Sequence, residues 1–263
     1  MSFTLTVVLG AIAGLTIFLG LPVARLRSLS PAWMAFLNAI ATGILIFLFW
    51  DIVTKATEPI DGALAAAKAG QPANFVLLVV LFAVGMGAGL LGLVYFETRY
   101  IRRAAEASRQ LEASPAQLST LIAIGIGLHN FSEGLAIGQA SRSGAISLAA
   151  ILVIGFALHN MTEGFGIAAP LTAGAAPTWR FLALVGLIGG GPTFLGTILG
   201  YGVQSEPVFV LCLALAAGSI LYVIMELLHS GRRFKLRELT MWGVLIGFML
   251  GYLTDLILSW GGA

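Results

Sequence analysis

The chain has 263 residues, of which 59% are apolar and only 10% are Asp, Glu, Lys or Arg. Soluble globular proteins average roughly 25% charged residues, so this chain has too few charges for a surface that faces water on all sides. The composition excludes an ordinary soluble domain and a disordered chain, and it predicts an integral membrane protein. Because a bilayer-crossing helix needs about 20 apolar residues, the length leaves room for eight such helices and for no separate soluble domain.

Long apolar stretches follow one another along the whole chain. We interpret all of them as helices, because a membrane β-barrel would show alternating strands of about ten residues. The first stretch lacks the positive region that precedes the apolar core of a cleaved signal peptide, so we expect it to be a retained span. The sequence predicts an all-α fold, a single transmembrane domain over residues 1–263, with helices near 4–24, 34–54, 74–97, 118–140, 144–170, 178–202, 207–229 and 239–260.

The 14 basic residues are divided unevenly between the two ends of these spans. Three lie on one face, Lys55, Lys68 and Arg142, and the positive-inside rule therefore predicts that this face is outside, together with both termini. The longest cytoplasmic connection is predicted over residues 98–117, either as a short surface helix ended by Pro115 or as a solvated connector. The other eleven basic residues lie on the predicted cytoplasmic face, at Arg25, Arg27, Arg99, Arg102, Arg103, Arg109, Arg180, Arg232, Arg233, Lys235 and Arg237.

The sequence argues against disulfides, cysteine metal sites and nucleic-acid binding. Cys212 is the only cysteine, which excludes an internal disulfide and a metal site built from several cysteines. The basic residues do not gather on one face of a soluble fold, so we predict no nucleic-acid binding.

A six-residue polar pattern, H-N-x-x-E-G, occurs once in the fourth span and again 30 residues later in the fifth. An acid or base at the centre of a membrane helix costs roughly 2.5–3.5 kcal/mol, so polar residues there are informative. His and Glu at positions i and i+4 share one helix face, and Asn at i+1 lies at the edge of that face. The two spans run in opposite directions, which predicts two motifs related by a two-fold axis in the membrane plane. The residues concerned are His129, Asn130, Glu133, His159, Asn160 and Glu163.

Two imidazoles, two carboxylates and two amide oxygens form a mixed nitrogen and oxygen ligand set. Such a set suits Zn²⁺, Fe²⁺, Mn²⁺ and similar divalent ions, whereas Mg²⁺ and Ca²⁺ prefer oxygen ligands alone. Two glutamates also balance the charge of one divalent ion. The alternative role of such residues, hydrogen bonding between helices, accounts better for a single motif than for two matched ones. The sequence therefore predicts a metal site between helices 4 and 5.

These residues resemble the ZIP (Zrt/Irt-like) family of metal-ion transporters, and the resemblance covers essentially the whole chain. HNMTEGFGIAAPL at 159–171 and AAGSILYVIMELL at 216–228 are similar to the bacterial and archaeal GufA-type branch. The resemblance implies uptake of a divalent metal into the cytoplasm across a prokaryotic inner membrane by a homodimer. It also implies that spans one, four, five and six move against a scaffold, that the six motif residues are the metal ligands, and that no catalytic cofactor is needed.

The sequence departs from the family pattern at several positions. Many members have Pro where this chain has Ser132 and Thr162, and here a hydroxyl can instead bond back to the preceding turn. Many members have Glu-Pro in span six as part of a second metal position, where this chain has Gly191 and Pro192. Without that carboxylate we expect one main ion.

Three further polar residues are candidates for the ion pathway, and two other functions are alternatives to metal transport. Glu226 and His229 in span seven, and Asp51 at the outer end of span two, are candidate pathway residues, although interfacial solvation would also explain them. An intramembrane zinc hydrolase would use a similar site, but the chain has no H-E-x-x-H and no evident nucleophile arrangement, so we predict no enzyme activity. A passive cation channel using the same site is the third alternative.

Overall fold

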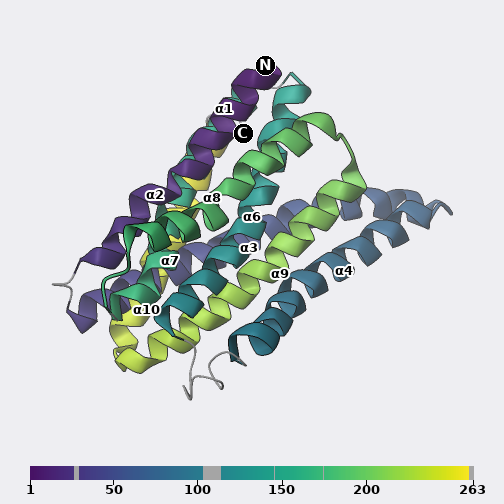
Figure 1. Cartoon of the computed structure of the whole chain (residues 1–263). Helices are drawn as coiled ribbons and strands as arrows, with labels where there is room; N and C mark the ends of the chain where they lie inside the picture. The colour runs from purple at the N-terminus through teal and green to yellow at the C-terminus, as the bar shows by residue number, and fades with distance from the viewer. Residues whose placement is uncertain (27–29, 103–113, 145, 174, 261–263) are drawn as a thin grey trace.

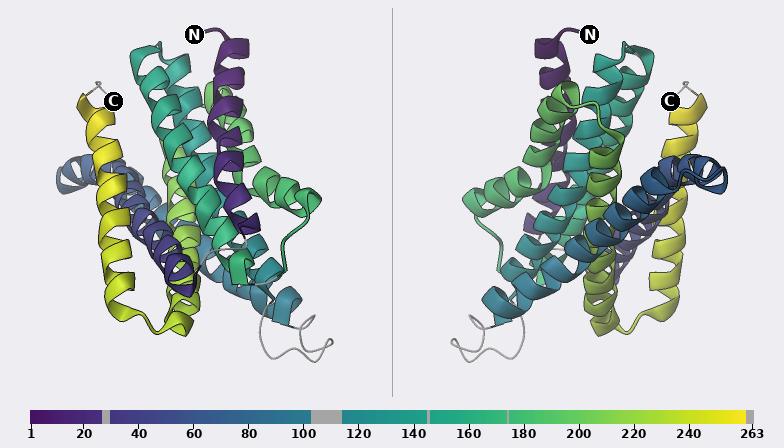
Figure 2. Two further views of the ribbon diagram at one scale, coloured as in Figure 1. Left: turned by 90° about the vertical axis from the view of Figure 1, so that its left-hand side faces the viewer. Right: turned by 90° about the vertical axis from the view of Figure 1, so that its right-hand side faces the viewer.

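The computed structural model describes residues 1–26, 30–102, 114–144, 146–173 and 175–260. Eight of its helical segments are long and apolar enough to cross a membrane, as the composition predicts, and the described residues contain no strand. The eight spans lie side by side in one bundle, and both chain termini lie at the same end of it (Figure 1, Figure 2). The prediction of eight transmembrane helices is confirmed.

The first span is composed of three short pieces. Helix α1 covers Phe3–Leu15, α2 covers Ile17–Gly20, and a 3-10 turn follows over Leu21–Arg25. The remaining helices are α3 (Pro31–Lys68), α4 (Ala73–Phe96), α6 (Pro115–Arg142), α7 (Ile146–Ala168), α8 (Trp179–Gly202), α9 (Glu206–Gly231) and α10 (Arg237–Trp260). A π-helical segment, Glu97–Arg102, continues α4, and 3-10 segments over Ala169–Ala173 and Arg232–Phe234 follow α7 and α9.

Helix α3 is much longer than the predicted span of 34–54. It starts at Pro31, which Ser30 caps by accepting from the amide of Trp33, and it continues through Pro59 to Lys68. The last turns contain Ala63, Leu64 and Ala65–Ala67, which are strong helix formers. The prediction placed a loop after residue 54 because hydropathy falls there, but low hydropathy ends a membrane span without ending a helix.

The start of α6 also differs from the prediction. Pro115 is the first residue of this helix, where its missing N–H is not needed. Ser114 and Gln117 form a reciprocal capping box with the backbone. Of the predicted cytoplasmic connection, residues 103–113 lie outside the described residues, and with them Arg103, Arg109 and any surface helix.

The helices form two groups, according to their most extensive contacts. In one group α6 packs on α8, and α1 packs on α8 and α7; in the other α4 packs on α9 and α3 packs on α10 and α9. The two groups meet through an extensive contact between α6 and α9. Glycines allow the backbones to touch in both groups. A Cβ on Gly14 would overlap the Gly190 carbonyl of α8, and one on Gly43 would overlap the Val244 carbonyl of α10. Contacts of this kind replace the hydrophobic driving force that lipid does not supply.

Replacing Gly89 of α4 by Ala is expected to lower the free energy of unfolding by about 1–3 kcal/mol, because the added Cβ would overlap the Leu215 carbonyl of α9. A Cβ on Gly87 of the same helix would meet no neighbouring atom within 4 Å, so Gly87→Ala is the matched control. Thermal unfolding in detergent measures both. Equal melting temperatures for the two variants would contradict the close α4–α9 packing.

Candidate metal site

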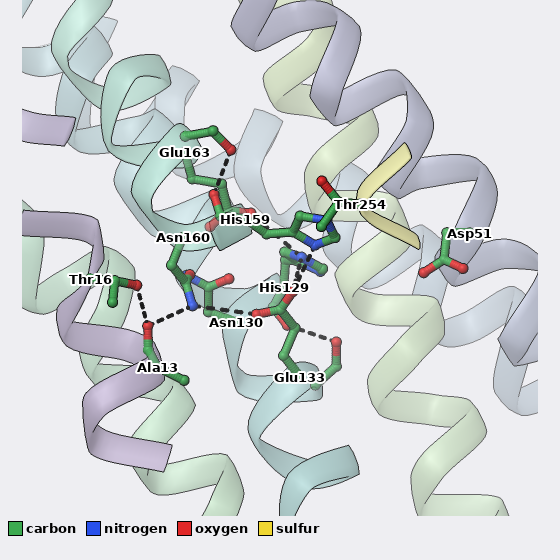
Figure 3. A network of polar contacts seen from close by, with 12 residues as sticks. Ala13, Thr16, Asp51, His129, Asn130, Glu133, His159, Asn160, Glu163 and Thr254 are labelled. Carbon is green, nitrogen blue, oxygen red and sulfur yellow. Dashed lines mark hydrogen bonds and ion pairs between the residues drawn. The ribbon is translucent and has the colours of Figure 1, made fainter. Parts of the chain in front are cut away.

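The two polar motifs lie on neighbouring antiparallel helices, α6 and α7, which are joined by a short connection at the end of the bundle that holds the termini (Figure 2). All six motif side chains are buried, with exposed fractions between 0% and 6%. They come from different turns of the two helices and converge on one cluster (Figure 3).

The imidazole of His129 is at the centre of this cluster. Its Nε2 lies 3.2 Å from Oε1 of Glu133, one turn further along α6, and 3.5 Å from Oε1 of Glu163 on α7. In the reciprocal direction, Nδ1 of His159 on α7 lies 3.9 Å from the same Glu133 oxygen. Each histidine therefore faces the glutamate of the other motif, as two copies of one motif on antiparallel helices should.

The glycine that ends each motif lets a neighbouring backbone approach beside the glutamate. A Cβ on Gly134 would overlap the carbonyl of Thr193 in α8, and a Cβ on Gly164 would overlap the carbonyl of Ile17 in α2. The last letter of the pattern thus has a structural role, because α8 and α2 pack directly against the two helix turns that carry Glu133 and Glu163.

The two asparagines are held by backbone carbonyls of helices outside the motif pair. Nδ2 of Asn130 donates to the carbonyl of Gly189 in α8 at 2.9 Å, and Nδ2 of Asn160 donates to the carbonyl of Ala13 in α1 at 3.1 Å. Because the amide nitrogen is engaged in both residues, each side-chain oxygen is left as the free acceptor. Sequence reasoning missed Gly189 and Ala13, since a contribution from a backbone carbonyl leaves no residue-type signal.

The hydroxyls of Ser132 and Thr162 bond back to the preceding turn, as predicted. Each donates at 2.7 Å to the carbonyl of the motif histidine three residues earlier, His129 and His159 respectively. Both helices continue through these positions without interruption. The hydroxyls therefore satisfy the two histidine carbonyls without the helix break that proline would introduce.

Many ligand-type atoms of the cluster are buried without a hydrogen-bond partner among the described residues. Buried polar atoms are rarely left in this state, and a group of them at one place requires an explanation. Their chemistry suits a metal, because each oxygen, and one of the two nitrogens of each neutral imidazole, carries a lone pair. They are both ring nitrogens of His129 and His159, Oδ1 of Asn130 and Asn160, Oε1 of Glu133, and both carboxylate oxygens of Glu163.

The side chains are close to a ligating arrangement without forming one. A tetrahedral ion with bonds of 2.0–2.1 Å has ligand atoms roughly 3.3 Å apart, and the two His129–glutamate separations approximate this value. As placed, however, no three His, Cys, Asp or Glu side chains among the described residues form a group that would hold an ion. An ion bound here would require the side chains to turn toward a common centre, above all His159, whose Nδ1 lies 3.9 Å from Glu133.

The three candidate pathway residues do not join the cluster. Asp51 lies on α3, apart from the six motif residues, and pairs with Lys55 at 2.7 Å (Figure 3). Glu226 and His229 lie in the last turns of α9, where His229 is exposed.

The fold and the cluster define the class of the protein, an integral membrane protein of eight spans with a buried polar centre. The model of the ZIP zinc transporter family matches residues 101–254, which is more than half of the chain and includes both motifs. The chain therefore belongs to the ZIP zinc transporter family, whose members transport metal ions and are not enzymes. A comparison with the curated proteins gave no match.

Proposed function

We propose that this protein carries divalent transition-metal ions into the cytoplasm, with Zn²⁺ as the main substrate and Fe²⁺, Mn²⁺ and Cd²⁺ as further ones. The observation that carries the proposal is the set of buried, unpartnered ligand atoms on His129, His159, Asn130, Asn160, Glu133 and Glu163. A mixed nitrogen and oxygen set binds these ions, and two carboxylates neutralise one of them. The six residues are the metal ligands, and one ion binds at a time.

The proposed mechanism is alternating access. An ion enters from the side of the chain termini, is attracted by Asp51, binds at the cluster, and leaves past Glu226 and His229. The direction rests on the positive-inside rule, which places the termini outside. The moving unit comprises α1, α2, α6, α7 and α8, and the scaffold comprises α3, α4, α9 and α10. Contacts of α6 with α8 and of α4 with α9 support this division, and the contact between α6 and α9 is then the surface along which the two units move.

The remaining parts of the proposal rest on the resemblance of the two quoted motifs to the GufA-type branch. They are a homodimeric assembly and a prokaryotic inner-membrane location. The further proposal of a single transmembrane domain over residues 1–263 rests on the chain length and the eight spans. Cross-linking of the protein in native membranes tests the first of these, since a homodimer gives a product of twice the chain mass.

Uptake into proteoliposomes tests the function. Flux of Zn²⁺ is expected to saturate at low concentration and to be reduced by competing Fe²⁺, Mn²⁺ and Cd²⁺ but not by Mg²⁺ or Ca²⁺. Flux that rises linearly with ion concentration, with single-channel currents, would favour a passive channel instead. Uptake inhibited equally by Mg²⁺ would contradict the nitrogen-containing site.

A further inference from the structure

The regular helix of the first span is interrupted at one residue beside the site, Thr16, whose own backbone angles stay in the right-handed helical region (φ −62°, ψ −18°). Helix α1 ends at Leu15 and α2 begins at Ile17, so that Thr16 lies between two helical pieces. At this interruption the carbonyl of Ala13 accepts hydrogen bonds from two side chains, the hydroxyl of Thr16 at 2.6 Å and the amide of Asn160 at 3.1 Å (Figure 3). The carbonyl that holds a motif residue is therefore itself held by a hydroxyl three residues further along the chain.

Backbone packing fixes the position of this interruption. A Cβ on Gly14 would overlap the carbonyl of Gly190 in α8, which brings α1 against α8 just before the break. A Cβ on Gly20 would overlap the carbonyl of Met161 in α7, which brings α2 against α7 just after it. Backbones in direct contact leave little room for adjustment. The packing of α1 on α8 and of α2 on α7 thus fixes the position of the Ala13 carbonyl relative to Asn160.

Asn160 connects the Ala13 carbonyl to the cluster of motif residues. The same Nδ2 atom of Asn160 that donates to Ala13 lies 3.5 Å from Oε2 of Glu133 on α6. The Oδ1 atom of Asn160 and the Oε1 atom of Glu133 are buried without hydrogen-bond partners. A chain of contacts from Thr16 through Ala13 and Asn160 thus reaches Oε2 of Glu133, and it leaves Oδ1 of Asn160 without a hydrogen-bond partner and Oε1 of Glu133 facing the two histidines.

The second asparagine differs in this respect. Asn130 donates to the Gly189 carbonyl inside α8, which is a continuous helix at that point. Only the Asn160 side depends on an interrupted helix and on a side-chain hydroxyl. We infer that Thr16 is a positioning residue of the metal site, which fixes the amide of Asn160 so that its oxygen faces the ion. This inference rests on the proposed function.

Removing the Thr16 hydroxyl is expected to weaken metal binding more than turnover. Loss of a residue that orients a metal ligand typically costs 10–100-fold in metal affinity. For Thr16→Val we expect the KM for Zn²⁺ uptake to rise about 10-fold, with the maximal rate within about twofold of the parent. Thr16→Ser, which keeps the hydroxyl, is expected to restore the parental KM.

Thr6→Val is the matched control. Thr6 lies in the same span, is fully buried, and donates to the carbonyl of Ser2 at 3.0 Å, but its hydrogen bond holds no motif residue. Its KM is expected to equal that of the parent. An unchanged KM in Thr16→Val, or an equal rise in Thr6→Val, would overturn the inference. If Thr16→Val does not fold, Thr16→Ala removes the same hydroxyl with a better helix former.

A double-substitution cycle separates this inference from the proposed function. Asn160→Ala is expected to raise the KM on its own, and adding Thr16→Val is then expected to change it no further. If Asn160→Ala leaves Zn²⁺ uptake unchanged, the proposed metal site is wrong. If Asn160→Ala impairs uptake but Thr16→Val still raises the KM by its full factor, the site stands and the positioning role of Thr16 is wrong.

Discussion

Replacement of Glu133 by Gln is expected to reduce Zn²⁺ uptake by at least about 100-fold. Glu133 contacts more members of the cluster than any other carboxylate, with His129 at 3.2 Å, the amide of Asn160 at 3.5 Å and His159 at 3.9 Å. Gln has nearly the same shape, so the packing against α8 at Gly134 is retained. What is lost is one negative charge and one strong ligand, and even residues that only support a ligand are worth 10–100-fold in affinity.

Uptake into proteoliposomes at equal protein content measures this effect. Glu206→Gln is the matched control, because Glu206 lies in the first turn of α9 and is exposed. It changes the net charge of the chain by the same amount without touching the cluster. If Glu133→Gln transported Zn²⁺ at a rate similar to Glu206→Gln, the cluster would not be the binding site.

The fold was largely predictable from the sequence, because the bilayer imposes a simple rule on length and hydropathy. That rule predicts the number of spans correctly, but it does not predict where each helix ends. It predicts the end of a span at residue 54, whereas α3 continues to Lys68 on alanines that are good helix formers but only weakly apolar. It also misses the break at Thr16, since the residues on both sides of it are apolar.

The cluster was predictable for a different reason. The fixed geometry of a helix places His129 and Glu133 on one face, and repetition of the motif on an antiparallel neighbour makes His159 and Glu163 meet them. The supports of the cluster were not predictable. The carbonyls of Ala13 and Gly189 that hold the asparagines are backbone atoms, and every residue has one. Their role comes from helix packing, which a single sequence does not encode in any local pattern.

The two glutamates of the cluster are expected to lower the stability of the metal-free protein, although the proposed function needs them as metal ligands. Both side chains are buried, and three of their four carboxylate oxygens have no hydrogen-bond partner among the described residues. Burying an ionised carboxylate whose oxygens lack hydrogen-bond partners costs more free energy than burying a neutral amide of nearly the same shape. The double variant Glu133→Gln with Glu163→Gln is therefore expected to unfold at a higher temperature than the parent when no metal is present.

Adding Zn²⁺ is expected to reverse that order. An ion that binds only the folded state stabilises it by about 2.7 kcal/mol at 100 times its dissociation constant, and the double variant should lose this increment along with the two carboxylates. Thermal unfolding in detergent, with and without Zn²⁺, measures both effects.

The control is Glu58→Gln with Glu206→Gln, which removes two exposed glutamates and should respond to Zn²⁺ as the parent does. A double cluster variant that is less stable without metal would show that the carboxylates support the fold through His129. One that Zn²⁺ still stabilises would place the ion elsewhere. The double substitution is thus expected to raise stability without Zn²⁺ and to lower it with Zn²⁺. Both effects have one physical origin, because the carboxylate oxygens that cost stability without metal are the atoms that bind the ion.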